Sequence, residues 1–184
     1  MTTSLTGLSI VLLIANGFNE GEFTEIQRTL MKTGAKITTV SPEKSVANGW
    51  FENGWGHYFP VDQHIGDALG SDFDMMVLVG GERGVAKLAG NPHTKRMVSH
   101  FLDAEKPLVA LNEAVTLLSL PGKVSGRHLA GDVTDPALAA TGAQITAGPV
   151  VVDRNLLTIQ SHDVASEVAA ILEHLATGRQ LAAA

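Results

Sequence analysis

Three nearly uninterrupted runs of apolar residues restrict what this chain can fold into more than any other feature of its sequence. They cover residues 8–15, Met75–Val79 and Pro107–Leu111. A strand with one face in water alternates apolar and polar residues, whereas a continuous run is typical of a strand covered on both faces. The runs therefore predict a largely parallel sheet packed between helices. Each run is far too short to cross a membrane.

Helical patterns fill the segments between these runs. Phe23, Ile26 and Leu30 recur at helical spacing, Asn91-Pro92 is typical of a helix start, and Asp163 is predicted to cap a last helix. Shorter strands are expected at 36–40, 144–145, 150–152 and 156–159. This alternation predicts an α/β fold, a three-layer sandwich whose flavodoxin-like, mostly parallel sheet has helices on both faces. We expect one domain over residues 1–184, with its core at about 8–177.

Residues 47–61 differ from the rest of the chain. Two Asn-Gly-Trp triplets, at 48–50 and 53–55, favour tight turns and predict a hairpin outside the main sheet. The segment also gathers Trp50, Phe51, Trp55 and Tyr58 in a chain with few aromatic residues. These side chains are compatible with a ligand-binding wall, with a subunit interface and with plain core packing.

The absence of cysteine excludes several kinds of chemistry. With no cysteine among 184 residues, the chain has no disulfide, no thiolate metal site and no thiol nucleophile. Its histidines lack metal-site spacing, so we expect neither a metal nor another cofactor. A net charge of −6 argues against nucleic acid and anionic membranes as partners. The N-terminus lacks the basic region of a signal peptide, so we expect a cytoplasmic protein.

The strongest candidate site follows the third apolar run. In Ala110-Leu111-Asn112-Glu113-Ala114, small residues lie two positions on either side of Asn112. A sharp strand-to-helix elbow needs small residues at this spacing, and such an elbow normally presents a nucleophile. Asn112 has no ionisable proton and is not a useful nucleophile. In open α/β sheets, ligands bind beyond the carboxyl ends of the strands, where this elbow lies.

The chain resembles the DJ-1/PfpI (ThiJ/PfpI, class I glutamine amidotransferase-like) superfamily from about Leu8 to Leu175. The resemblance rests on an ordered series of segments: 16–22 after the first strand, Val40-Ser41-Pro42, 73–81, 106–110 and 151–158. It implies that Asn112 stands at the position of the catalytic cysteine and that Glu22 is the acidic residue beside it. Glu113 would replace a histidine found in many hydrolase-like members. Gly80 and Gly81 would supply backbone N–H groups, and His162 would line the site.

The same resemblance predicts that the cysteine-dependent protease, glyoxalase and deglycase activities are absent. The region from Lys106 to Leu118 also resembles the C-terminal domain of large-subunit catalases, a branch with few cysteines. We therefore expect a non-catalytic binding, regulatory or stress-related homodimer with a small-molecule ligand. The alternative is an enzyme that uses Glu22 and Glu113 for acid–base chemistry on a small carbonyl or amide compound. A direct Asn112–Glu22 hydrogen bond with no cavity would favour the first hypothesis, and a pocket with an ordered water between Glu22 and Glu113 the second. A third possibility is a structural interaction module like the catalase domain, which would present an exposed apolar face in place of a pocket.

The run Ser161-His162-Asp163 is better explained by the start of the last helix, which Asp163 is expected to cap, than by catalysis. Ser161-His162-Asp163 contains the residue types of a hydrolytic triad. Adjacent residues point in different directions, whereas a triad is assembled across space, so we do not interpret these three residues as one.

Overall fold

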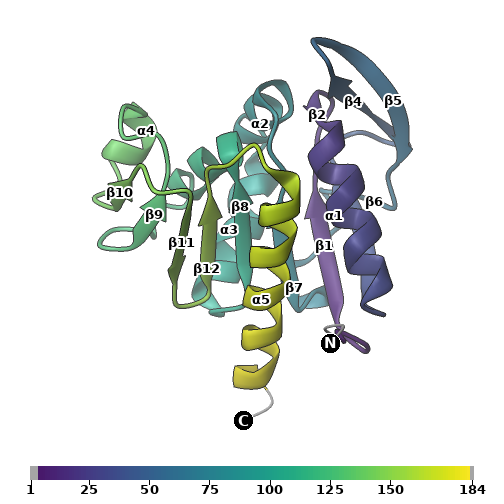
Figure 1. The fold of residues 1–184 in the computed structure, drawn as a ribbon. Helices are drawn as coiled ribbons and strands as arrows, with labels where there is room; N and C mark the ends of the chain where they lie inside the picture. Colours follow the sequence, from purple (N-terminus) through teal and green to yellow (C-terminus); the bar gives the residue numbers. More distant parts are fainter. Residues whose placement is uncertain (1–3, 183–184) are drawn as a thin grey trace.

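The computed structural model describes residues 4–182 and is built around a seven-stranded sheet (Figure 1). All neighbouring strands are parallel except β11, which runs antiparallel to β12 at one edge. The strand order is β11 (Val150–Asp153), β12 (Leu156–Ile159), β8 (Leu108–Leu111), β7 (Met75–Leu78), β1 (Ser9–Leu13), β3 (Lys36–Ser41) and β6 (Gln63–His64). The predicted three-layer fold with a mostly parallel sheet is confirmed.

The apolar runs are continuous because the sheet is buried on both faces. Along β1, Val11 and Leu13 pack on one face, while Ile10 and Leu12 pack on the other. Each of these four side chains is fully buried. Burying one such side chain contributes about 1.5–3 kcal/mol, so the central strands anchor the fold.

Two helices cover each face of the sheet. One face is packed against α1 (Glu20–Lys32) and α5 (Val164–Ala182), and the other against α2 (Glu82–Ala89) and α3 (Pro92–Asp103). Short 3₁₀ helices, η1 (Gly70–Asp72) and η2 (Asn112–Ser119), join these layers. Beyond β11, a small unit holds β9 (His128–Ala130), α4 (Pro136–Ala139) and β10 (Gln144–Thr146), as Figure 1 shows.

Residues 46–60 form the predicted hairpin, which stands beside α1 at one end of the sheet (Figure 1). It consists of β4 (Val46–Phe51) and β5 (Gly54–Pro60), and β4 also pairs with the short strand β2 (Phe18–Asn19). The turn lies at Glu52 and Asn53, whose φ angles are 47° and 65°. The expected turn at Asn48-Gly49 is wrong, because that pair lies inside β4 at an irregularity of the ladder.

Helix ends are fixed by side chains that the sequence indicated. Asn91 accepts a hydrogen bond from His93 N–H at 2.9 Å and so caps α3, as predicted. Asp163 accepts one from Ala165 N–H at 3.2 Å at the start of α5. Within the described part of the chain, no helix combines the length and the apolarity needed to span a bilayer.

Candidate functional site

The elbow after β8 is formed as the spacing of small residues predicts. Asn112 follows Leu111 directly and has a φ of 50°, a left-handed conformation that asparagine tolerates better than most residues. Ala110 and Ala114 on either side are fully buried. The Asn112 side-chain oxygen accepts a hydrogen bond from Ser161 N–H at 2.9 Å. Asn112 is thus held both by its backbone and by its side chain.

Glu22 reaches the elbow from the first turn of α1 and is 1% exposed. Its Oε1 accepts a hydrogen bond from Asn112 Nδ2 at 2.8 Å, and its Oε2 accepts one from Gly80 N–H at 2.5 Å. A Cβ atom at Gly80 would lie 2.9 Å from Glu22 Oε2, so a glycine is needed for this approach. The structure therefore places the predicted acid, the elbow residue and the first glycine in direct contact.

Glu167 on α5 is a second buried carboxylate at the elbow, and sequence reasoning missed it. It is 1% exposed, and Asn112 Nδ2 donates to its Oε1 at 3.3 Å. Its Oε2 is buried and finds no hydrogen-bond partner among residues 4–182. A sequence signal existed, because Glu167 lies four residues before Ile171 on the buried side of the last helix. An acidic residue in that position requires a partner inside the protein.

The two buried carboxyl groups hold protons more tightly than exposed ones. Burial, followed by the charge of Glu167, raises the pKa of Glu22 to about 7. Burial also raises the pKa of Glu167. Because the groups interact closely, their protons belong to the pair rather than to either residue. The pair accordingly takes up a proton in a pH range where exposed carboxyl groups are ionised.

Glu113 lies at the glycine turn beside Glu22, the carboxylate with which the acid–base hypothesis combines it. Its side chain is exposed, and its Oε2 accepts a hydrogen bond from Gly81 N–H at 2.9 Å. Gly81 has a φ of 112°, and a Cβ atom there would lie 2.5 Å from Asn19 N. Both predicted glycine N–H groups are therefore bound to carboxylates of the chain itself. A Cβ atom at Gly80 would lie 2.9 Å from Glu22 Oε2 and 3.0 Å from Glu113 Oε2, so the two carboxylates approach the same glycine. The charge of Glu113 accordingly adds to the causes that raise the pKa of Glu22.

His162 lies at the rim of the elbow and is exposed. It follows Ser161, whose N–H donates to the Asn112 side chain at 2.9 Å, so it adjoins the elbow in sequence. Asp163 accepts a hydrogen bond from Ser166 Oγ at 2.6 Å, in keeping with its role at the start of α5 rather than in a triad. No set of three or more His, Asp or Glu side chains in the described ranges is placed to hold a metal ion.

Comparison with known proteins identifies the family. Residues 8–174 match the model of the DJ-1/PfpI family. The chain belongs to the DJ-1/PfpI family. It is 28% identical to "Protein DJ-1 homolog D" of Arabidopsis thaliana over 112 residues, which cover 54% of this chain and 29% of that protein. The match thus spans less than a third of this curated relative.

Solved structures of DJ-1/PfpI proteins share the fold. A ThiJ/PfpI domain protein from Brachyspira murdochii superposes with a TM-score of 0.81 at 20% identity, over 92% of this chain and 96% of that one. A two-domain protein from Anabaena variabilis, with a DJ-1/ThiJ/PfpI-like and a ferritin-like domain, gives a TM-score of 0.82 at 23% identity. That likeness covers 91% of this chain and 48% of the Anabaena protein. At these identities the likeness concerns the fold.

This member of the DJ-1/PfpI family differs from the cysteine-bearing pattern at the residue on which that pattern depends. It has asparagine at the elbow and no cysteine anywhere in its sequence. Thiohemiacetal and thioester intermediates require a thiolate, as does sensing through cysteine oxidation. The elbow geometry is present in this chain, but the thiol chemistry is not available to it.

Proposed function

We propose that this DJ-1/PfpI protein is a pseudoenzyme, a cytoplasmic homodimer with a non-catalytic binding or regulatory role. The support comes from how the elbow is filled. Asn112 donates both amide hydrogens to carboxylates, at 2.8 Å and 3.3 Å, and its oxygen accepts from Ser161 N–H. It is 8% exposed. An elbow residue whose hydrogen-bonding capacity is used inside the protein acts as a structural link between α1, β8 and α5.

The hairpin supports the homodimer. Phe51, Trp55 and Tyr58 are 49%, 57% and 70% exposed, so plain core packing does not explain them. Trp50 is more protected, packing edge-on against Trp55 and beneath Arg83, whose guanidinium carbon lies 4.2 Å from the centre of its ring. Aromatic residues are enriched at subunit interfaces, and two-fold dimers are the commonest soluble oligomers. A sedimentation experiment that finds only monomer at micromolar concentration would contradict this part of the proposal.

The proposal that the protein is non-catalytic is tested by measuring its turnover of methylglyoxal, a small carbonyl substrate. We expect no activity from the native protein or from Asn112→Ser, and a gain of activity from Asn112→Cys, since only the last supplies a thiol. Asn112→Ser is the matched control, because it removes the same amide without adding a nucleophile. Turnover by the native protein, lost in Glu22→Gln, would overturn the proposal in favour of carboxylate chemistry.

One observation favours that alternative enzyme. A carboxyl group with a pKa of about 7 is suited to general acid–base catalysis near neutral pH. Against this, Glu22 is 1% exposed and both of its oxygens accept hydrogen bonds from the protein. The charge of Glu167 raises the pKa of Glu22 more than the charge of Glu113 does. The elbow would have to open before Glu22 could reach a substrate.

A further inference from the structure

The sequence contains three Asn-Gly pairs, at residues 16–17, 48–49 and 53–54. Asparagine followed by glycine is the pair most prone to spontaneous deamidation, because glycine has no Cβ atom that would shield its backbone nitrogen from the asparagine side chain. The structure places the three pairs in different surroundings. Their rates of deamidation should therefore differ, although their local sequences are alike.

Deamidation begins when the backbone nitrogen of the glycine attacks Cγ of the asparagine. A bond forms between these two atoms and closes a five-membered imide. The bond between Cγ and Nδ2 breaks, and this nitrogen takes up the proton of the backbone nitrogen and leaves as ammonia. A water molecule then opens the ring at either carbonyl, which gives aspartate or isoaspartate. Water is the only co-reactant, but the backbone must rotate before the nitrogen can reach Cγ.

The first pair is held in place by the second. Asn48 N–H donates to Asn16 Oδ1 at 2.7 Å, and Gly17 N–H donates to the Asn48 carbonyl at 2.8 Å. The nitrogen that would attack Asn16 is thus already bound, and Gly17 is buried. A Cβ atom at Gly17 would lie 2.4 Å from Arg83 Cβ, so α2 packs directly against this pair. The first pair therefore lacks the freedom to form an imide.

The second pair is enclosed as well. Gly49 is buried inside β4, where it pairs with Phe18 of β2. A Cβ atom at Gly49 would lie 2.6 Å from Glu20 Oε2, which shows how closely α1 packs against this backbone. Close packing of this kind opposes rotation of the chain. Neither inner pair can reach the geometry of the imide unless this end of the molecule unfolds.

The third pair lies at the turn of the hairpin and lacks these restraints. Asn53 is exposed, and its side chain makes no hydrogen bond within the described residues 4–182. Phe51 and Gly54 form the last pair of the ladder, where a hairpin frays first. A Cβ atom at Gly54 would meet no atom nearer than the Phe51 carbonyl oxygen at 3.9 Å, so the backbone has space around it.

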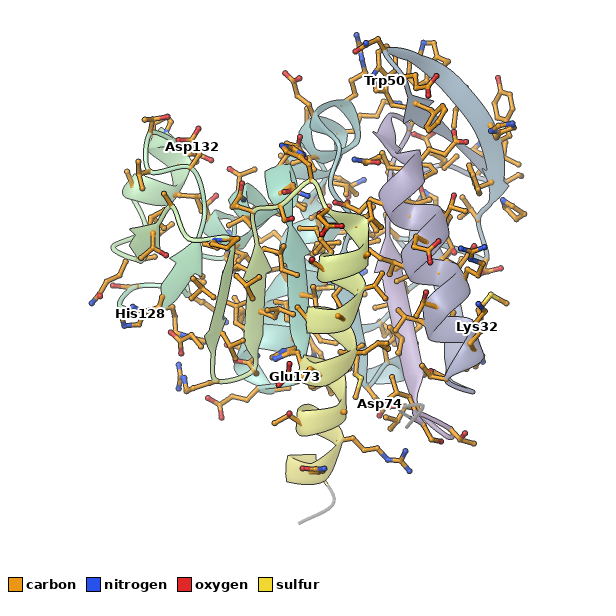
Figure 2. The ribbon with its side chains drawn as sticks, in the orientation of Figure 1. Lys32, Trp50, Asp74, His128, Asp132 and Glu173 are labelled. Carbon is orange, nitrogen blue, oxygen red and sulfur yellow. The ribbon has the colours of Figure 1, made fainter. Side chains whose placement is uncertain are left out.

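The turn is also accessible to water and tolerates the product. Trp50 pairs with Trp55 just before the turn, and Figure 2 shows Trp50 at the outer end of the hairpin. Glu52 and Asn53, the two turn residues, have left-handed φ angles of 47° and 65°. Aspartate adopts this conformation as asparagine does, so the hairpin can keep its turn after conversion of Asn53 to aspartate.

We propose that Asn53 is a site of spontaneous deamidation, in which the Gly54 nitrogen attacks Asn53 Cγ and the turn gains a carboxylate. The new charge lies next to Glu52, on the hairpin that exposes Phe51 and Trp55. Charged residues are depleted at the centre of protein interfaces, so the modification makes this end of the hairpin a poorer contact surface. The proposal does not depend on the elbow or on the homodimer, so each can fail without the others.

The test is incubation of the native protein in dilute, mildly alkaline solution, followed by peptide mapping with mass spectrometry. We expect a mass gain of one dalton in the peptide that carries Asn53, divided between aspartyl and isoaspartyl forms. In water enriched in heavy oxygen, the product should retain one oxygen atom from the solvent. The rate at Asn53 should exceed the rates at Asn16 and Asn48 at least about ten-fold, equivalent to about 1.4 kcal/mol of activation free energy.

Denaturation and two variants make the assignment specific. In denaturant the three pairs should react at similar rates, because the fold alone protects the first two. Gly54→Val should slow the reaction at Asn53 at least about ten-fold, since a branched side chain shields the nitrogen. Gly148→Val is the matched control, because a Cβ atom there also has room, 3.8 Å from Thr146 Oγ1, and it should leave the rate at Asn53 unchanged.

Three outcomes would overturn the proposal. They are the absence of modification at Asn53, equal rates at the three pairs in the folded protein, and an unchanged rate at Asn53 in the Gly54→Val variant.

Discussion

Two glutamates on the first turn of α1 are buried in opposite surroundings. Glu20 is 7% exposed and faces the hairpin, where it accepts hydrogen bonds from His57 N–H at 2.8 Å and meets the His57 ring at 2.5 Å. Glu22 is 1% exposed and faces the elbow, where it accepts from Gly80 N–H and Asn112 beside a second carboxylate. Both are at the helix N-terminus, whose dipole favours negative charge.

The difference shows that the partners of a buried carboxylate decide how well its charge is stabilised, as much as its burial does. Glu20 fits because the hairpin has glycines where it passes: Cβ atoms at Gly49 and Gly56 would lie 2.6 Å and 1.8 Å from its Oε2. Its partners are the backbone N–H and the ring of His57, with no second carboxylate among them. Glu22 has comparable hydrogen bonds, but the negative charge of Glu167 adds to the cost of desolvation. Glu20 thus has hydrogen-bond donors and no neighbouring carboxylate. Glu22 has donors as well, but burial and the charge of Glu167 raise its pKa.

Removing each glutamate should give the largest contrast. At pH 5, Glu22→Ala should lower the free energy of unfolding by about 3–4 kcal/mol, because it leaves buried donors without partners and opens a void. Glu20→Ala should cost about 1–2 kcal/mol, because the His57 side chain is 83% exposed and water can replace the lost bonds. Urea unfolding of both variants measures the difference. Equal losses would show that the two sites are energetically alike.

The next largest expected effect is a pH dependence of stability that originates at Glu22. The pKa of Glu22 is raised from 4.5 to about 7, so the native state binds more protons than the unfolded chain between these values. The contribution of this group is therefore most favourable below about pH 4.5 and falls by about 3 kcal/mol as pH rises to about 7.

Glu167→Gln isolates this effect, because it removes the neighbouring charge and keeps the shape of the side chain. We expect the variant to be similar to the native protein at pH 5 and more stable by about 1–2 kcal/mol at pH 8. Urea titrations from pH 5 to pH 8 test this. Parallel curves for the two proteins would show that no shared titration exists.

The smallest effect is expected at the hairpin. His57→Ala should lower stability by less than about 1 kcal/mol, because exposed ion pairs contribute little. It should nevertheless weaken self-association in sedimentation equilibrium, since the hairpin carries the exposed aromatic residues proposed to form the interface. His128→Ala, at an exposed histidine on β9, is the control. Unchanged association of the His57→Ala variant would show that the contacts between Glu20 and His57 do not support the dimer.

The sequence predicted the sheet, the main helices and the elbow because each has a local cause. Continuous apolar runs require two covering layers, and small residues around Asn112 permit the sharp reversal. The α1 pattern of Phe23, Ile26 and Leu30 is confirmed, since all three side chains are buried. The contact between Glu22 and Asn112 was inferred through family resemblance, because 90 residues separate them in sequence.

The parts that were missed depend on contacts between distant segments. Asn48-Gly49 has a turn sequence, yet it lies in a strand because Gly49 makes room for Glu20. Glu113 was expected at the elbow, but its hydrogen bond with Gly81 N–H comes from a segment 32 residues away and could not be read from the sequence. Glu167 could have been noticed as an acid on a buried helix face, but its partner could not be deduced from periodicity alone. In each case a residue from another layer decides the conformation.

The two-residue strand β2 has a consequence for the dynamics of this end of the molecule. Phe18 and Asn19 pair with Gly49 and Trp50 of the hairpin, while Asn19 N–H donates to the Gly80 carbonyl at 2.8 Å and the Asn19 side chain caps α1. The segment Phe18–Asn19 therefore contacts the hairpin, the start of α1 and the turn at Gly80 at the same time. Segments joined in this way open as a cooperative unit, so hydrogen exchange should give their amides a common free energy of opening.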